Sequence, residues 1–185
     1  LPLVEAIAKV KEASTTKFDG SVELHFHFTT KKGKKGVEDE LARGIVNLPH
    51  GLGKTRKVVI LTEDSIAELA KTGVIDFDVA IATPAIMPKM GKVAKLLGTK
   101  GKMPSPKAGT VTDKPDEVKA AIEAGRVEWR QDAGHNVHQM IGKVSWDDAK
   151  LIENAQVVLK AFPVNRIESI CLTSTMGPAV RVLKK

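Results

Sequence analysis

The sequence predicts a mixed α/β fold of two domains, in which both chain ends build one domain and the middle of the chain is inserted as the other. Residues 21–28 alternate between apolar and polar side chains, which is typical of a strand with one buried face. Residues 57–61 and 77–82 are largely apolar runs with a helical pattern between them, which favours parallel strands covered on both faces. Strand patterns return at 167–172 and 180–183. These late strands are expected to pair with the early ones, because the middle offers them no partner.

Helices and turns are predicted from apolar spacing and from chain breakers. Residues 2–13 are expected to form a helix, because Val4, Ile7 and Val10 fall on one face. The last helix is expected at 145–161, with Ser145 as its N-cap and acidic residues in its first turn. The other predicted segments are a basic loop at 29–36, a strand at 43–48, a breaker cluster at 49–53, helices at 65–71, 86–97 and 115–124, a loop at 98–109, and a hairpin of 126–130 with 137–144.

The expected domain boundaries follow from this order of segments. Domain I is predicted to comprise residues 1–50 and 141–185, and domain II to comprise residues 51–140. The chain must cross between the domains twice, and both expected crossings carry glycine. Pro49, Gly51 and Gly142 are therefore predicted to form a hinge, since glycine absorbs changes in backbone dihedrals.

Composition restricts the class of partner. The chain of 185 residues has a formal net charge of +7, which favours an anionic partner and nucleic acid before a membrane. Aromatic residues make up 4% with no tyrosine, so an aromatic platform for stacking bases is not expected. No apolar run reaches the ~20 residues that a membrane span needs. The single Cys171 excludes an intramolecular disulfide and fits a reduced compartment.

Lysines are concentrated in one stretch of the predicted domain II. Residues 79–112 contain no acidic residue and carry six lysines: Lys89, Lys92, Lys95, Lys100, Lys102 and Lys107. Two prolines at 104 and 106 stiffen the loop that holds Lys102 and Lys107. This loop is the expected site of a secondary RNA or tRNA contact.

Two short segments carry the groups expected to bind a ligand. Thr173, Ser174 and Thr175 supply hydroxyls directly after an apolar run. They are followed by the thioether of Met176 and the bare backbone of Gly177. Hydroxyls and free N–H groups bond phosphate and ribose oxygens, and glycine permits close backbone approach. In the second segment Lys17 would contact phosphate, while Ser21 and Glu23 would contact ribose hydroxyls. An ordinary helix-to-strand loop is the alternative interpretation of that second segment.

Two other chemistries, nucleotide binding and metal binding, are disfavoured by the sequence. The segment Gly51–Thr55 is similar to the end of a phosphate-binding loop, and a nucleotide-dependent enzyme is the alternative function, but Leu48 stands where that motif needs glycine. Four of the five histidines, at 25, 27, 135 and 138, occur in two close pairs without cysteine or carboxylate partners at ligand spacing, so no metal site is expected. No cofactor is predicted.

The chain resembles the ribosomal protein L-one family, bacterial type. The matching stretches occur in order along nearly the whole chain: Ala6–Val10, Lys17-Phe18-Asp19, Val46–Lys54 (VNLPHGLGK), Phe77–Pro84 (FDVAIATP), Met103–Val111 (MPSPKAGTV), Gly125–Val127, Ile141–Ser145 (IGKVS) and Ser174–Pro178 (STMGP). The resemblance implies a split α/β (βαβ-type) first domain and an inserted Rossmann-like, three-layer α/β second domain. It also implies a ribosomal protein without enzymatic activity.

The resemblance further implies the partners and the contact residues. The partners would be 23S-type rRNA at the base of the mobile stalk, exit-site tRNA, and the protein's own mRNA leader, whose translation it would repress. The protein would be cytoplasmic, and monomeric outside the ribosome. The RNA contacts would fall on Lys17, Phe18, Ser21, Glu23, Thr173, Ser174, Thr175, Met176 and Gly177. Residues 70–76 replace a longer segment usual in relatives, so the family's domain II features transfer less directly.

Overall fold

The computed structural model describes residues 1–29, 43–162 and 166–183. The chain divides into two compact units. Unit 1 comprises Leu1–Gly53 with Gly125–Lys185, and unit 2 comprises Lys54–Ala124. The basic loop predicted at 29–36 lies outside the described residues from residue 30 onward.

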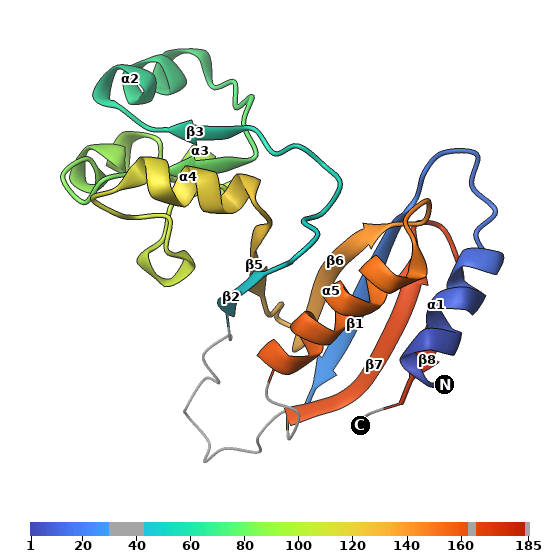
Figure 1. Ribbon diagram of the computed structural model, residues 1–185. Helices are drawn as coiled ribbons and strands as arrows, with labels where there is room; N and C mark the ends of the chain where they lie inside the picture. The colour runs from blue at the N-terminus through green and yellow to red at the C-terminus, as the bar shows by residue number, and fades with distance from the viewer. Residues whose placement is uncertain (30–42, 163–165, 184–185) are drawn as a thin grey trace. The chain divides into compact units, whose positions relative to one another are not determined.

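The main part of unit 1 is a four-stranded antiparallel sheet with two helices on one face (Figure 1). The strand order is β6 (Asn136–Lys143), β1 (Ser21–Phe28), β7 (Ile167–Ser174), β8 (Val180–Val182), and the helices are α1 (Leu3–Glu12) and α5 (Asp148–Ala161). The expected pairing of late strands with early ones is confirmed for β7, which pairs with β1, but not for β8, which pairs with β7.

The alternation predicted for β1 is the alternation observed. Val22, Leu24, Phe26 and Phe28 are buried, and the residues between them are half-buried on the opposite face. The buried set packs against α1 and α5, where Ile7, Val10, Leu151 and Val158 are fully covered. Each such side chain contributes about 1.5–3 kcal/mol by leaving water. This packing leaves the other face of the sheet free of helices.

The predicted hairpin of 126–130 with 137–144 is wrong. Strand β5 (Arg126–Arg130) pairs with β2 (Arg43–Asn47), while β6 pairs with β1, and only one bridge, Gln131 to Val137, joins the two segments. The reason is burial, because Val46 and Val127 face each other in the β2–β5 ladder and both belong to the core of unit 1.

This pairing moves the second domain boundary. The sequence placed it between residues 140 and 141, whereas the compact units divide between Ala124 and Gly125. Gly142 therefore lies inside β6 and not at a crossing, so its assignment to a hinge is wrong. A Cβ atom on Gly142 would stand 2.7 Å from both Leu151 Cδ2 and Trp146 Cε3, so the glycine makes room for packing.

Unit 2 is a small parallel α/β unit. Strands β3 (Val58–Ile60) and β4 (Val79–Ile81) pair in parallel, and a parallel bridge from Ala82 to Val111 extends the pair. The helical segments are α2 (Glu63–Thr72), η1 (Met87–Lys92), α3 (Ala94–Thr99), η2 (Pro106–Ala108) and α4 (Pro115–Glu123). Its core is separate from that of unit 1 and includes Leu61, Ile66, Met90 and Leu97.

Two helix predictions need correction. The helix expected at 86–97 is divided into η1 and α3, because Pro88 removes a backbone donor and Gly91 is a weak helix former. Ser145 does not cap α5, whose N-cap is Asp147. The Ser145 side chain instead donates to Asp19, which belongs to the candidate site.

No helix within the described ranges is long and apolar enough to cross a membrane.

Candidate nucleic-acid interface

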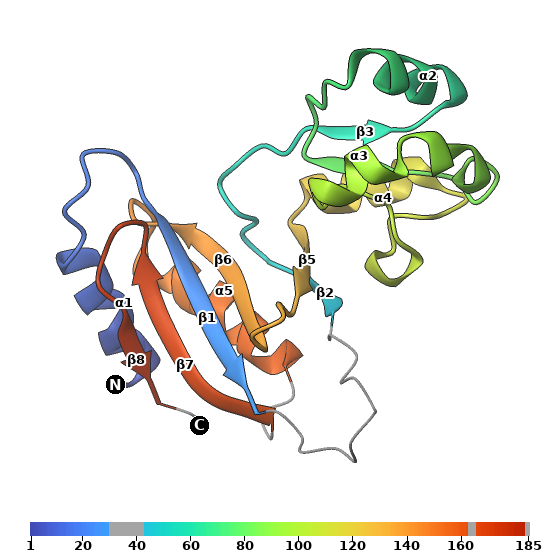
Figure 2. The ribbon, with the colours of Figure 1, turned by 180° about the vertical axis from the view of Figure 1, so that it is seen from behind.

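Segments from opposite ends of the chain meet at one end of the sheet of unit 1. The Thr175 N–H donates to Ser21 O at 2.9 Å, and the Ser21 N–H donates to Thr175 Oγ1 at 2.9 Å, although the two residues are 154 positions apart. Glu23 pairs with Thr173 in the β1–β7 ladder. The two segments predicted to bind a ligand therefore form one cluster, on and beside the face of the sheet that no helix covers (Figure 2).

Lys143 completes this cluster and was not among the predicted contacts. Its Nζ donates to Asp19 O at 3.1 Å and lies 3.5 Å from Ser21 Oγ. The Asp19 carboxylate in turn accepts bonds from Ser145 N at 3.1 Å and Ser145 Oγ at 2.9 Å. These contacts fix the loop that carries Lys17 and Phe18. The signal was the IGKVS stretch, where a lysine ends a strand, but only the β1–β6 register places it beside Ser21.

Two large apolar side chains are exposed at the cluster. Met176 is 84% exposed and Phe18 is 57% exposed, and Lys17, which precedes Phe18, is exposed as well. Met176 adopts a left-handed backbone conformation, with φ of 63°, at the turn that follows β7. Exposed apolar side chains beside a cation are suited to pack on ribose or base faces while the cation contacts phosphate.

The predicted hydroxyls are used differently from the expectation. Thr173 Oγ1 donates to Gly177 O at 3.1 Å, and Thr175 Oγ1 accepts the Ser21 N–H, so both hydroxyls hold the turn together. Ser174 is 2% exposed because it shares the inward parity of Leu172, and its prediction as a contact side chain is wrong for this conformation. The surface consequently offers Glu23, Lys17, Lys143, exposed apolar groups and backbone more than free hydroxyls.

Gly177 has a packing role inside the turn. Its N–H donates to Ser174 O at 2.8 Å, and a Cβ atom on Gly177 would lie 2.2 Å from Ser174 Oγ. The Ser174 Oγ atom is itself buried without a hydrogen-bond partner among the described residues. A side chain at position 177 would therefore force the Ser174 hydroxyl to move, independently of any ligand.

This packing gives a test by double substitution. Gly177→Ala is expected to cost about 1–3 kcal/mol of unfolding free energy, because the new methyl group overpacks against Ser174. Ser174→Ala alone should be close to neutral, since the lost hydroxyl has no partner in the folded chain. The double variant should recover most of the loss in urea denaturation. Strictly additive losses would show that Ser174 is not the group the new methyl meets.

The loop at 51–55 lacks the surroundings of a nucleotide site. Gly51 and Gly53 have φ of 63° and 66°, and the chain then continues into strand β3. A phosphate-binding loop leads instead into a helix, whose N-terminal N–H groups hold the phosphate. The alternative of a nucleotide-dependent enzyme at Gly51–Thr55 is therefore not supported by the local fold.

The cationic stretch of unit 2 is partly used within that unit. Lys102 Nζ donates to Phe77 O and lies 5.9 Å from the centroid of the Phe77 ring. Lys89 forms an ion pair with Glu63. Lys107 lies on the short helix η2 and is exposed. A secondary RNA or tRNA contact at Lys102 and Lys107 stays a prediction, with Lys107 the more accessible cation.

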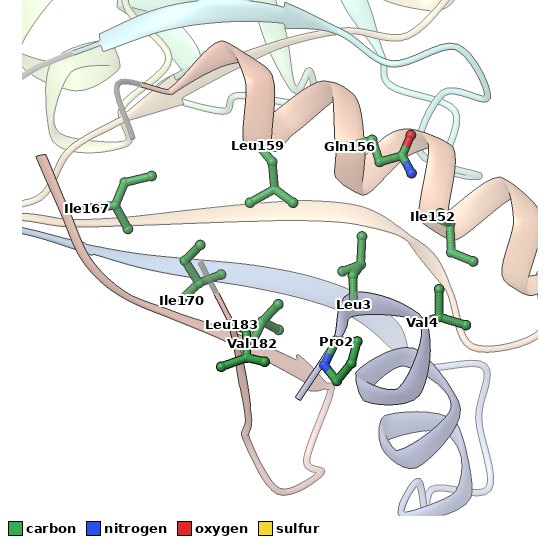
Figure 3. Close-up of a pocket in the computed structure, with 10 residues that line it drawn as sticks. All are labelled: Pro2, Leu3, Val4, Ile152, Gln156, Leu159, Ile167, Ile170, Val182 and Leu183. Carbon is green, nitrogen blue, oxygen red and sulfur yellow. The ribbon is translucent and has the colours of Figure 1, made fainter. Parts of the chain in front are cut away.

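The described part of the chain contains no group of three or more histidine, cysteine, aspartate or glutamate side chains placed to hold a metal ion. An apolar groove of about 400 Å³ lies elsewhere on unit 1 (Figure 3). Its lining comes from the start of α1, from α5, and from β7 and β8, and Gln156 is its single polar side chain among the lining residues. The groove thus offers a single amide and no charged side chain for binding ribose or phosphate.

The fold is a split unit with an inserted α/β unit, and sequence comparisons identify its family. The model of the Ribosomal protein L1p/L10e family matches residues 10–73 and 66–178. Large ribosomal subunit protein uL1 of Streptomyces griseus is 40% identical over 205 aligned residues, which cover 96% of this chain and 83% of that protein. The proteins of the same name from Chlorobium chlorochromatii and Phytoplasma australiense are 40% and 35% identical over 97% and 98% of this chain, and 88% and 89% of theirs.

The chain therefore belongs to the ribosomal protein L1 family, whose members are ribosomal proteins and not enzymes. The predicted resemblance to that family is confirmed.

Proposed function

We propose that this chain is a structural constituent of the large ribosomal subunit in the cytoplasm, and that its unit 1 binds rRNA at the base of the mobile stalk. The observation that carries the proposal is the pair of hydrogen bonds between Ser21 and Thr175, which assembles one contact surface from both chain ends. Family membership supports RNA as the ligand class of that surface.

Each charged or apolar group on the surface has a counterpart in folded RNA. Lys17 and Lys143 suit phosphate oxygens, and the Glu23 carboxylate suits a ribose 2′-hydroxyl, which distinguishes RNA from DNA. Phe18 and Met176 supply apolar area that loses water on contact. Recognition would rest on shape, ribose and phosphate more than on base edges, because the surface presents few side chains able to read an edge.

Two further roles belong to the proposal. The protein would accompany the release of exit-site tRNA, with Lys107 and Lys102 of unit 2 as the secondary contact, and would repress translation by binding its own mRNA leader on the same surface as rRNA. A leader RNA that fails to compete with a stalk-base rRNA fragment would contradict the shared surface. Monomeric behaviour of the free protein is part of the same proposal.

The ligand class can be tested without choosing an RNA beforehand. The protein is crosslinked in a cell lysate, and the bound RNA is sequenced. Reads are expected to concentrate in one folded segment of large-subunit rRNA, with a second and weaker peak in the mRNA leader. Reads distributed over all RNAs in proportion to their abundance would contradict the proposal.

Lys143 provides a quantitative test of the surface. Lys143→Gln is expected to weaken binding to a stalk-base rRNA fragment and to reduce the slope of log affinity against log salt by about 0.7–0.9, the value for one lost phosphate contact. Lys160→Gln, an exposed lysine on helix α5 of the same unit, is the matched control and should change neither quantity. An unchanged salt slope in Lys143→Gln would remove this residue from the surface.

A further inference from the structure

A pair of histidines lies on the open face of the sheet, one row beyond Glu23. His25 of β1 stands opposite His138 of β6, and the two Nδ1 atoms are 2.7 Å apart. The rings meet edge to face, with centroids 4.9 Å apart. A separation of 2.7 Å between two ring nitrogens requires one proton between them, donated by one ring and accepted by the other.

Each ring also turns its second nitrogen toward a carboxylate. His25 Nε2 is 4.0 Å from Glu23 Oε2, and His138 Nε2 is 3.6 Å from Asp132 Oδ2. The bond from the Asn136 N–H, at 2.6 Å, is the main reason why the pKa of Asp132 lies below its usual value, so this carboxylate stays ionised. Glu23, His25, His138 and Asp132 thus form one continuous polar row.

The contacts in this row favour one charge state of the histidine pair. With a proton on each Nε2 and one proton shared between the Nδ1 atoms, the pair carries three ring protons and one positive charge, and every contact is satisfied. Removing one proton leaves a bare nitrogen facing a carboxylate or facing the other nitrogen. Adding one puts two N–H groups against each other and breaks the Nδ1 contact. The pair therefore titrates as a coupled unit.

The neighbouring charges on this face are few. On β1, His27 bonds Asn136 Oδ1 at 2.7 Å and lies 3.6 Å from Glu168 of β7. Cys171 of β7 stands opposite His25, and Arg181 of β8 stands opposite Cys171. Burial, followed by the charge of His138 and opposed by Glu23, holds the pKa of His25 below its usual value.

We infer that the His25–His138 pair is a proton-binding site that couples the RNA affinity of this face to pH. The inference rests on the proposed function. A rise of about 3.3 Å per residue puts the Cα atom of His25 about 7 Å from the Cα atom of Glu23 along β1. This distance is shorter than the Debye length of ~8–10 Å, so charges on the pair and at Glu23 interact. Bound phosphates would favour a further proton, and with it a second positive charge, on the pair. Linkage then requires that uptake of this further proton strengthen RNA binding to the same extent.

The affinity test compares three proteins over a pH series. For the wild-type chain, affinity for the stalk-base rRNA fragment is expected to rise by about tenfold between about pH 7.5 and about pH 5.5, which corresponds to one unit of change in proton affinity on binding. His138→Gln should lose most of this rise. His50→Gln is the matched control, because His50 also bonds a carboxylate, Glu153, but lies away from the sheet face. An equal rise in His138→Gln and in wild type would overturn the inference.

Improved folding cannot produce the same signal. Since the folded chain holds the pKa of His25 below its value of 6.5 in the unfolded chain, the unfolded state binds more protons, and unfolding free energy falls as pH drops through 6.5. Stability and RNA affinity are therefore expected to move in opposite directions.

A second measurement on the free protein separates this inference from the proposed function. Histidine ring resonances are followed by NMR through the same pH series without RNA. His25 is expected to titrate at a higher pH in His138→Gln than in wild type, because its cationic neighbour has been removed. An unchanged midpoint would overturn the coupling of the pair. Absence of rRNA binding at every pH would instead refute the proposed function, whatever the NMR result.

Discussion

Gly125→Ala is expected to destabilise unit 1 by about 2–4 kcal/mol, from backbone strain and a steric clash together. Gly125 has φ of 116°, a conformation that side chains rarely adopt. A Cβ atom there would stand 2.5 Å from Leu48 O and 3.0 Å from Gly51 Cα. Both are backbone atoms, and Leu48 N also donates to Gly125 O at 3.0 Å, so neither segment can yield without breaking this contact.

Urea denaturation followed by tryptophan fluorescence is the measurement for Gly125→Ala. Trp129 and Trp146 are the tryptophans of the chain, and both belong to unit 1, so the signal reports this unit alone. Gly51→Ala separates strain from clash, because Gly51 has φ of 63° but nothing within 4 Å of a new Cβ atom. Gly51→Ala should cost about 1 kcal/mol, the left-handed penalty alone. Equal losses in the two variants would show that Leu48 O relaxes freely.

The fold class followed from patterns that are local in the sequence. The alternation in β1 and the apolar runs at β3 and β4 are decided by which side chains leave water. The structure buries the apolar side chains of β1 and two of the three residues of β4, while the residues of β3 are half-buried. Strand partners are not local. The β2–β5 ladder could not be predicted because the turn at 132–135 connects β5 to β6 as a hairpin loop would, while burial selects another partner.

The candidate site could be predicted only in part, because some of its residues are brought together by strand pairing that is not local in the sequence. Residue types indicated Lys17, Glu23 and the turn after β7, and the structure brings these segments together. Lys143 and the His25–His138 pair depend on the β1–β6 register, which contains a shift between Val22 and Glu23 that no sequence pattern indicates. Gly142 was misassigned because a glycine needed for packing and a glycine needed for a hinge look alike in a sequence.

The register shift also leaves a backbone carbonyl outside the ladder, and Asn154 donates a hydrogen bond to it. Gly142 pairs with Val22 and Met140 with Glu23, so Ile141 has no place in the β1–β6 ladder. Asn154 of α5 is fully buried, and its Nδ2 donates to Ile141 O at 2.7 Å and to Gly51 O at 3.1 Å. Its Oδ1 accepts the His50 N–H at 3.2 Å. One side chain therefore satisfies backbone groups in the bulged strand and in the turn that ends the first segment of unit 1.

Asn154→Ala is expected to lower the unfolding free energy of unit 1 by about 3–5 kcal/mol, because it leaves several backbone groups without partners in a largely buried site. The same fluorescence-detected urea titration measures it. Gln156→Ala on the same helix is the control, since Gln156 is exposed and its loss should stay within about 0.5 kcal/mol. The turn at 48–51 should also lose hydrogen-exchange protection at His50 before the rest of unit 1 opens. A loss in Asn154→Ala no larger than in the control would mean that water or a shifted backbone replaces the amide, and that α5 does not fix this turn through Asn154.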